Sequence, residues 1–252
     1  MSFVSRSRRR HRRPRTVPRP RLVAGLAALL SLAALLVASG PTAGAAPASS
    51  VAYPAGAAST RYIGLAFDTC TAPSAATMQA WLDSPYRAIG VYIGGINRGC
   101  DQPRLTASWV TAVSKMRWRL IPIYMGRQAP CTERPNSTKI TPSLARSPGE
   151  SAARDALSKT KALGMLPGGA LYADMEHYNP NDSACRTAAL RFLSGWTGEL
   201  HRLGYLAGVY THLNSGAKHL AQVYTSTSFN RPDAIWIARW DLSSSLSNWS
   251  GI

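Results

Sequence analysis

Six short apolar runs follow residue 60, and they restrict the fold more than any other feature of the chain. Each has six to eight residues, and a longer segment, in most cases with helical spacing, separates it from the next. The runs are Tyr62–Asp68, Ala88–Gly94, Leu120–Met125, Ala170–Glu176, Leu206–Thr211 and Ala234–Asp241. Strands that are buried on both faces have this composition. The alternation therefore predicts an α/β fold with a parallel sheet.

The helical segments between these runs carry their own start and stop signals. Thr106 can cap one helix, and Ser147-Pro148-Gly149-Glu150 has the spacing of a capping box with proline in the first turn. Gly164 and Gly204 stand where a helix ends in a left-handed residue. The Trp and Met residues at helical spacing are interpreted as core residues.

Two architectures fit six parallel strands: an open doubly wound sheet or a (β/α)8 barrel. The chain has no GxGxxG or GxxxxGK[ST] loop after any strand, which disfavours a nucleotide-binding sheet. A barrel has eight strands and typically about 250 residues. We therefore expect a (β/α)8 TIM-barrel type domain over 61–252 that is truncated after its sixth strand and requires no cofactor.

The first 46 residues have the layout of an export signal. Nine arginines and no acidic residue occupy the first 21 positions, an uncharged apolar run covers Leu22–Ala38, and Ala43-Gly44-Ala45 supplies a cleavage site. A run of 17 residues is at the short limit for spanning a ~30 Å hydrocarbon core. We expect residues 1–46 to be a signal peptide of the Sec or twin-arginine route, contacting the membrane only transiently. Residues 47–60 are then a flexible linker.

Removal of this signal changes the charge of the chain. The full sequence has a net charge of +17, but twenty basic and twelve acidic residues remain after residue 46, a net charge of +8. Most of the argument for a nucleic-acid partner is lost with the signal. We expect a secreted protein, extracellular or associated with the cell wall, with wall glycan as partner and no nucleic acid.

Four cysteines, in an exported chain, predict two disulfides. Three pairings are possible from the count alone. Cys70 and Cys100 follow the first and second strands, and Cys131 and Cys185 follow the third and fourth. Because neighbouring strands place their following loops side by side, we favour Cys70–Cys100 and Cys131–Cys185.

Acidic residues gather at the carboxyl ends of the predicted strands, where α/β proteins carry their sites. Asp68 ends the first strand, and Tyr172, Asp174 and Glu176 share one face of the fourth. Two carboxylates on one strand face, with Cα atoms about 6.5–7 Å apart, cannot both ionise freely, so one is expected to hold a proton. A general acid beside a carboxylate is what glycosidic cleavage requires.

Two other interpretations of the acids remain open. One acid could pair structurally with an arginine such as Arg239 or Arg127, or the acids could bind a hard cation. No CxxC or HxxxH pair indicates a metal site, and GxSxG is absent. Aromatic residues near the strand ends could stack on sugar rings, namely Tyr92, Tyr124, Tyr172, Tyr210, Trp236 and Trp240.

Several segments in order resemble the glycoside hydrolase-like domain of exported bacterial proteins, a domain of unknown function. They are GLAFDTCTAPSAATMQAW (64–81), SPYRAIGVYIGG (84–95), WRLIPIYMGRQAPC (118–131), ALYADMEHY (170–178), GYLAGVYT (204–211) and WIARWD (236–241). That family is in turn similar to the family-25 lysozymes, which are (β/α)8 muramidases. The resemblance implies a first-strand aspartate, Asp68, and a D-x-E pair, Asp174 and Glu176, with Glu176 as the acid. It also implies a W-x-A-x-aromatic sixth strand, Trp236 to Trp240.

Three functions follow from these observations. The leading one is carboxylate acid/base hydrolysis of a cell-wall glycan such as peptidoglycan by Glu176, Asp174 and Asp68. A non-catalytic glycan-binding protein on the same barrel is the alternative, and a metal-dependent phosphodiesterase barrel is the second alternative. The lysozymes also use an aspartate late in the barrel, and no residue of this chain matches it.

Overall fold

The computed structural model describes residues 62–165 and 168–240. The expected signal peptide and linker, and Asp241 at the end of the sixth run, lie outside these residues. The strands are β1 (Leu65–Thr69), β2 (Tyr86–Gly94), β3 (Arg119–Tyr124), β4 (Ala170–Met175), β5 (Leu206–His212) and β6 (Ala234–Ala238). The helices are α1 (Ala75–Ala80), α2 (Ala107–Lys115), α3 (Arg146–Ala162), α4 (Ser183–Arg202) and α5 (Lys218–Gln222). Short helical turns are η1 (Trp81–Asp83), η2 (Pro142–Leu144) and η3 (Leu213–Ala217).

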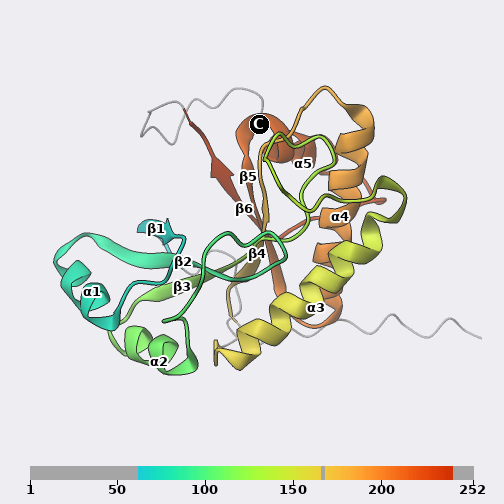
Figure 1. The fold of residues 1–252 in the computed structure, drawn as a ribbon. Coiled ribbons are helices and arrows are strands. Elements are labelled where there is room, and N and C mark those ends of the chain that lie inside the picture. The colour runs from blue at the N-terminus through green and yellow to red at the C-terminus, as the bar shows by residue number, and fades with distance from the viewer. Residues whose placement is uncertain (1–61, 166–167, 241–252) are drawn as a thin grey trace, which may run out of the picture. The chain divides into compact units, whose positions relative to one another are not determined.

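The six strands form one parallel sheet in sequence order, β1-β2-β3-β4-β5-β6, which confirms the predicted fold class (Figure 1). The sheet curls into a half-barrel. Trp236 on β6 reaches the second strand, since a Cβ atom at Gly90 would lie 3.2 Å from its ring. A glycine is therefore required at position 90, where the indole crosses the interior of the curl.

The outer face of the sheet packs against the helices, and α3 and α4 lie side by side along it (Figure 1). Trp196 of α4 is fully buried and donates its indole N–H to the Gly208 carbonyl of β5 at 3.2 Å. Met78 and Trp109 are also buried, as expected for core residues. Trp81 is different, because 39% of it is exposed. No helix in the described part of the chain is long and apolar enough to cross a membrane.

Most predicted helix ends are confirmed, and one is wrong. The Thr106 hydroxyl accepts a hydrogen bond from the Trp109 backbone N–H, and Gly164 and Gly204 have φ angles of 68° and 78° after α3 and α4. The capping box at Ser147 does not form. Since η2 continues almost directly into α3, Ala145 already has helical backbone angles and Ser147 lies inside the helix.

Candidate active site

The interior of the curl brings together side chains from five strands, β1, β2, β4, β5 and β6. Tyr172 and Asp174 point inward from β4, and Tyr210 on β5 lies opposite Asp174 in the register. Trp236 on β6 lies opposite Tyr210. Asp68 comes from β1, where its Cβ atom would lie 2.8 Å from a Cβ atom at Gly90. Successive strands therefore supply one continuous inner surface.

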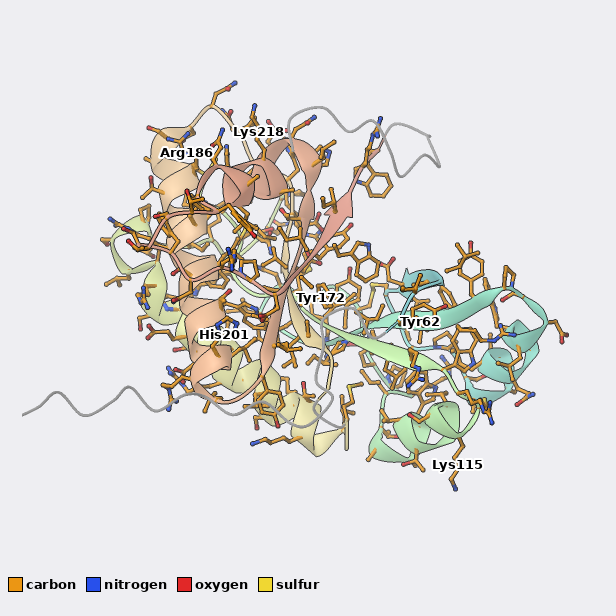
Figure 2. The ribbon with its side chains drawn as sticks, turned by 180° about the vertical axis from the view of Figure 1, so that it is seen from behind. Tyr62, Lys115, Tyr172, Arg186, His201 and Lys218 are labelled. Atoms are coloured by element: carbon orange, nitrogen blue, oxygen red, sulfur yellow. A yellow bond between two sulfur atoms is a disulfide. The ribbon has the colours of Figure 1, made fainter. Side chains whose placement is uncertain are left out.

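Four of the six predicted aromatic residues line this surface, and we call them the aromatic group: Tyr92, Tyr172, Tyr210 and Trp236. The Trp236 ring meets the Tyr172 and Tyr210 rings edge-on, with centroids 6.1 and 5.5 Å away. Tyr172 lies in the middle of the sheet in Figure 2. Gly208 leaves room for its ring, since a Cβ atom there would be 2.6 Å from it. Burial, followed by the carboxylates of Asp174 and its neighbours, raises the pKa of Tyr92 and Tyr210.

Asp174 is the most unusual residue of the site. It is only 2% exposed, and neither of its carboxyl oxygens has a hydrogen-bond partner of normal geometry among the residues the structure describes. Burial, and then the nearby Glu176 carboxylate, raise the pKa of Asp174 to about 8, although Arg134 and the Tyr92 hydroxyl act in the opposite direction. A pKa of about 8 favours the protonated form of Asp174 at neutral pH, in which the carboxyl group has both a donor and an acceptor atom inside the curl.

Glu176, two residues further on, has a different environment. Its carboxylate forms an ion pair with the Arg134 guanidinium at 3.0 Å, and its side chain is 33% exposed. An arginine such as Arg239 or Arg127 was one expected structural partner for an acid of this pair. Arg127 instead donates to the Lys139 carbonyl, and Arg134 is the partner of Glu176. Burial thus favours a bound proton on Asp174, whereas the lysozyme resemblance implies Glu176 as the acid.

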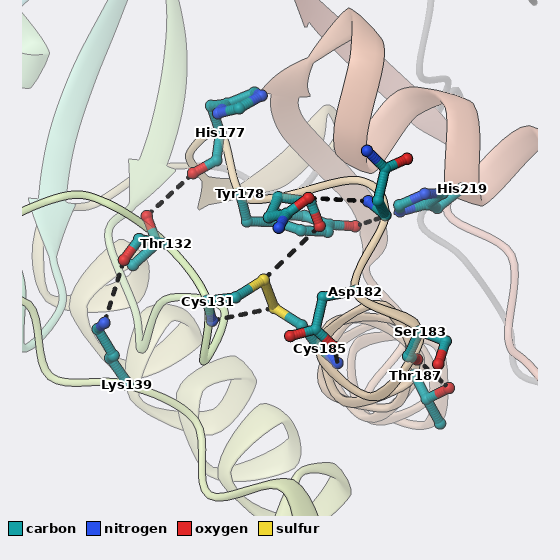
Figure 3. Close-up of a disulfide and its surroundings, with 12 residues drawn as sticks. Cys131, Thr132, Lys139, His177, Tyr178, Asp182, Ser183, Cys185, Thr187 and His219 are labelled. Atoms are coloured by element: carbon teal, nitrogen blue, oxygen red, sulfur yellow. Dashed lines mark hydrogen bonds between the residues drawn. A yellow bond between two sulfur atoms is a disulfide. The ribbon is translucent and has the colours of Figure 1, made fainter.

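Arg134 belongs to the segment 125–141 between β3 and η2, which we call the β3 loop. A disulfide joins Cys131 of this loop to Cys185 of α4, and the Thr132 hydroxyl donates to the His177 carbonyl at 2.9 Å (Figure 3). The Thr132 hydroxyl also accepts the Arg134 backbone N–H at 3.3 Å. These bonds hold Arg134 beside Glu176.

Both disulfides have the predicted partners. Cys70–Cys100 joins the segments after β1 and β2, and Cys131–Cys185 joins those after β3 and β4. Adjacent parallel strands place their carboxyl ends side by side, which explains why each pair connects consecutive strands. The described residues contain no free cysteine.

Two predicted aromatic residues do not join the aromatic group. Tyr124 points to the opposite face of the sheet, where its hydroxyl donates to Asp155 of α3 at 2.7 Å and its ring stacks on Trp196. Its position at the strand end suggested the inner surface, but the alternation of side chains places it outside. Trp240 lies beyond β6 and is 83% exposed.

Sequence reasoning missed two residues of the site. Arg134 lies in a polar loop with no motif around it. Gln128 is fully buried and bonds to the backbone on both sides of Met175. A lone glutamine just after a strand gives no signal for this role. Within 62–165 and 168–240, no group of three or more His, Cys, Asp or Glu residues could hold a metal ion.

The fold is a curled parallel half-barrel of the TIM-barrel type, with carboxyl groups and aromatic rings on its inner surface. The family model of the Rv2525c-like, glycoside hydrolase-like domain matches residues 79–251, and the chain belongs to this family. None of the curated proteins matches the chain.

Among solved structures, three resemble this chain at low identity. An uncharacterized protein of B. stearothermophilus is 20% identical, with a TM-score of 0.48 over 69% of this chain and 73% of its own. The modular autolysin LytC of Streptococcus pneumoniae is 12% identical, with a TM-score of 0.38 over 56% of this chain and 30% of its own. A family 2 AP endonuclease of Brucella melitensis is 9% identical, with a TM-score of 0.41 over 69% of this chain and 67% of its own.

Proposed function

We propose that the chain is a secreted glycoside hydrolase that acts on a cell-wall glycan such as peptidoglycan. The observation that carries the proposal is the buried Asp174 carboxyl group, which has a raised pKa, beside an accessible Glu176 that forms an ion pair with Arg134. A buried polar group without partners costs roughly 1–3 kcal/mol, and a hydroxyl group of a bound glycan would offset this cost by supplying the missing hydrogen bonds. One protonated and one charged carboxyl group on a strand face are the acid–base pair of glycosidic cleavage.

The two acids have separate positions and therefore separate roles. Glu176 is accessible and would face the leaving oxygen of a bound glycan. Asp174 lies deeper and would supply the proton that the pair gives to this oxygen. The bond between the anomeric carbon and the leaving oxygen breaks, and that oxygen takes the proton of the pair. Water adds its hydroxyl to the anomeric carbon and returns a proton to the pair. Asp68 supports the pair electrostatically.

The aromatic group supplies the binding surface. Tyrosine and tryptophan faces accept the C–H groups of sugar rings, and the half-exposed rings leave such faces available. Arg134 is released from Glu176 as the glycan enters, which frees the Glu176 carboxyl group for the reaction. Both disulfides are consistent with work outside the cytoplasm.

The test is the release of soluble glycan fragments from purified cell walls by the wild-type protein and by Glu176→Gln. We expect turnover to fall at least about 100-fold in the variant, since loss of a group that takes part in general acid–base catalysis typically costs ~10²–10⁴-fold. Glu150→Gln is the matched control, because Glu150 pairs with Arg146 on the exposed surface of α3 at 3.1 Å. Unchanged turnover in Glu176→Gln refutes the assignment.

Binding of walls without product release by the wild-type protein would instead support the non-catalytic alternative. The aromatic group favours that alternative, because it forms a binding surface independently of the acids. Under it, Asp174→Asn combined with Glu176→Gln leaves wall binding unchanged. Co-sedimentation with the walls measures this binding directly.

A further inference from the structure

The hydrogen-bond ladder between β3 and β4 is short and ends just before Asp174. β3 and β4 pair at only two positions, Ile123 with Tyr172 and Tyr124 with Ala173. The other side of β4 pairs with β5 through to Met175. Asp174 and Glu176 therefore extend past the last residue of β3 that pairs with their strand.

The Gln128 side chain occupies the place of the missing strand. Its amide Nε2 donates to the Asp174 carbonyl at 2.8 Å, and its Oε1 accepts the Glu176 backbone N–H at 2.9 Å. In a parallel ladder, one residue bonds in this way to the two residues that flank its partner on the next strand. The Gln128 amide thus acts as a peptide group opposite Met175.

Gln128 is itself held in one position. It is fully buried, its backbone N–H donates to the Thr138 carbonyl at 3.0 Å, and its own carbonyl accepts the Ile140 N–H at 2.8 Å. Asn97 holds the same loop from the β2 side, donating to the Gly126 and Thr138 carbonyls. Because the loop holds Gln128 in place, the Gln128 amide in turn holds the end of β4 in a fixed position.

We propose that Gln128 is a positioning residue whose side-chain amide continues the β3–β4 ladder and fixes Asp174 and Glu176 at strand spacing on one face. The role of Gln128 in catalysis rests on the proposed function. Only an amide of this length supplies one donor and one acceptor there. Glutamate offers acceptors alone when ionised, and methionine fills a similar volume without a donor.

The primary test measures the titration of Asp174 by carboxyl NMR in the wild-type protein, Gln128→Met and Gln128→Glu. Five groups face Asp174: Glu176 on its own strand, Arg134 in the β3 loop, Tyr92 on β2, Asp68 on β1 and Tyr210 on β5. In Gln128→Met, which introduces no charge, the end of β4 gains freedom, and Asp174 gains water and distance from Glu176. We expect the Asp174 titration to move toward acid pH by about one unit or more.

Gln102→Met is the matched control. The Gln102 amide makes the same two bonds to the segment after β1, donating to the Cys70 carbonyl at 2.6 Å and accepting the Ala72 N–H at 2.9 Å. This variant loses equivalent hydrogen bonds but leaves β4 in place, so the Asp174 titration stays at its wild-type pH. Wall turnover is measured in parallel, and we expect kcat to fall by roughly 10–100-fold in Gln128→Met, with a smaller change in KM.

Three results would overturn the positioning role. One is a wild-type Asp174 titration in both folded Gln128 variants. Another is an equal shift in Gln102→Met. The third is loss of the native circular dichroism spectrum in both Gln128 variants, because the amide would then be a requirement for folding. A wild-type protein without turnover refutes the proposed function alone, since the titration does not depend on activity.

Discussion

Replacing Asp174 with asparagine should remove activity and yet stabilise the protein at neutral pH. Burial raises the pKa of the Asp174 carboxyl from 3.8 to about 8, so the folded protein holds a proton that the unfolded chain releases. A group whose pKa is raised by folding stabilises most below its unfolded pKa. Its contribution is lost as the pH rises toward the folded pKa. The stability of the wild-type protein should therefore fall between about pH 4 and pH 8.

The loss of stability depends on how far the pH lies above the unfolded pKa of Asp174. At pH 7 the aspartate is about three pH units above its unfolded pKa, and at about 1.36 kcal/mol per unit this costs roughly 4 kcal/mol. Asparagine does not titrate, so Asp174→Asn removes this cost. Its buried amide hydrogens introduce a penalty of about 1–3 kcal/mol. The net gain is about 1–3 kcal/mol at pH 7, or a rise in Tm of roughly 2–12 °C for a domain of this size.

Thermal unfolding of the wild-type protein and Asp174→Asn at pH 5, 7 and 8.5 measures this effect. The gain should be close to zero at pH 5, where the cost of the raised pKa is much smaller and similar to the penalty of the buried amide, and largest at pH 8.5. Asp83→Asn, in the exposed turn η1, is the control and should show no such trend. A stability difference that is the same at all three pH values would refute the argument.

Two further predictions concern the support of the site. Replacing both Cys131 and Cys185 with serine should lower the free energy of unfolding by about 2–4 kcal/mol, because the disulfide closes a long loop, and denaturant unfolding measures this loss. The same variant should release less glycan from cell walls because Arg134 loses its anchor, and unchanged turnover would contradict that role. The Arg202 and Arg154 guanidinium groups lower the pKa of Glu199 to about 2, so this carboxylate stabilises the fold above its ordinary pKa of 4.5, and that contribution is lost as the pH falls toward 2. In urea unfolding at pH 7, Glu199→Gln should cost about 1 kcal/mol at low salt and less at high salt, because both arginines are exposed. No cost at low salt would contradict the pairing.

The sheet and the disulfides could be predicted because they depend on local patterns and strand order. Near-continuous apolar runs identify buried strands, and sequential order places each cysteine beside its partner. The start of α3 could not be predicted from its capping box. The competing signal was η2, whose turn leads into the helix before Ser147 can cap it.

The spacing of Asp174 and Glu176 predicts that both cannot ionise freely, but spacing alone does not indicate which of them holds a proton. That depends on burial and on a partner distant in sequence. Asp174 is 2% exposed, whereas Glu176 reaches Arg134, which is 42 residues away along the chain. Tyr124 lies at a strand end, but the alternation of side chains along β3 places its ring on the outer face, where it stacks on Trp196.

The geometry of the acid pair therefore depends on a loop more than on the sheet. β3 stops pairing at Tyr124, and beyond it β4 is held on that side by the Gln128 amide, by Thr132 and by the Cys131–Cys185 disulfide. Local opening of such a loop costs less free energy than unfolding the domain. Because the loop also carries Arg134, one opening would move Glu176 and release its counter-charge together. Site geometry consequently depends on the Gln128 amide directly, and Gln128→Met should shift the titration of Asp174 even where the domain stays folded.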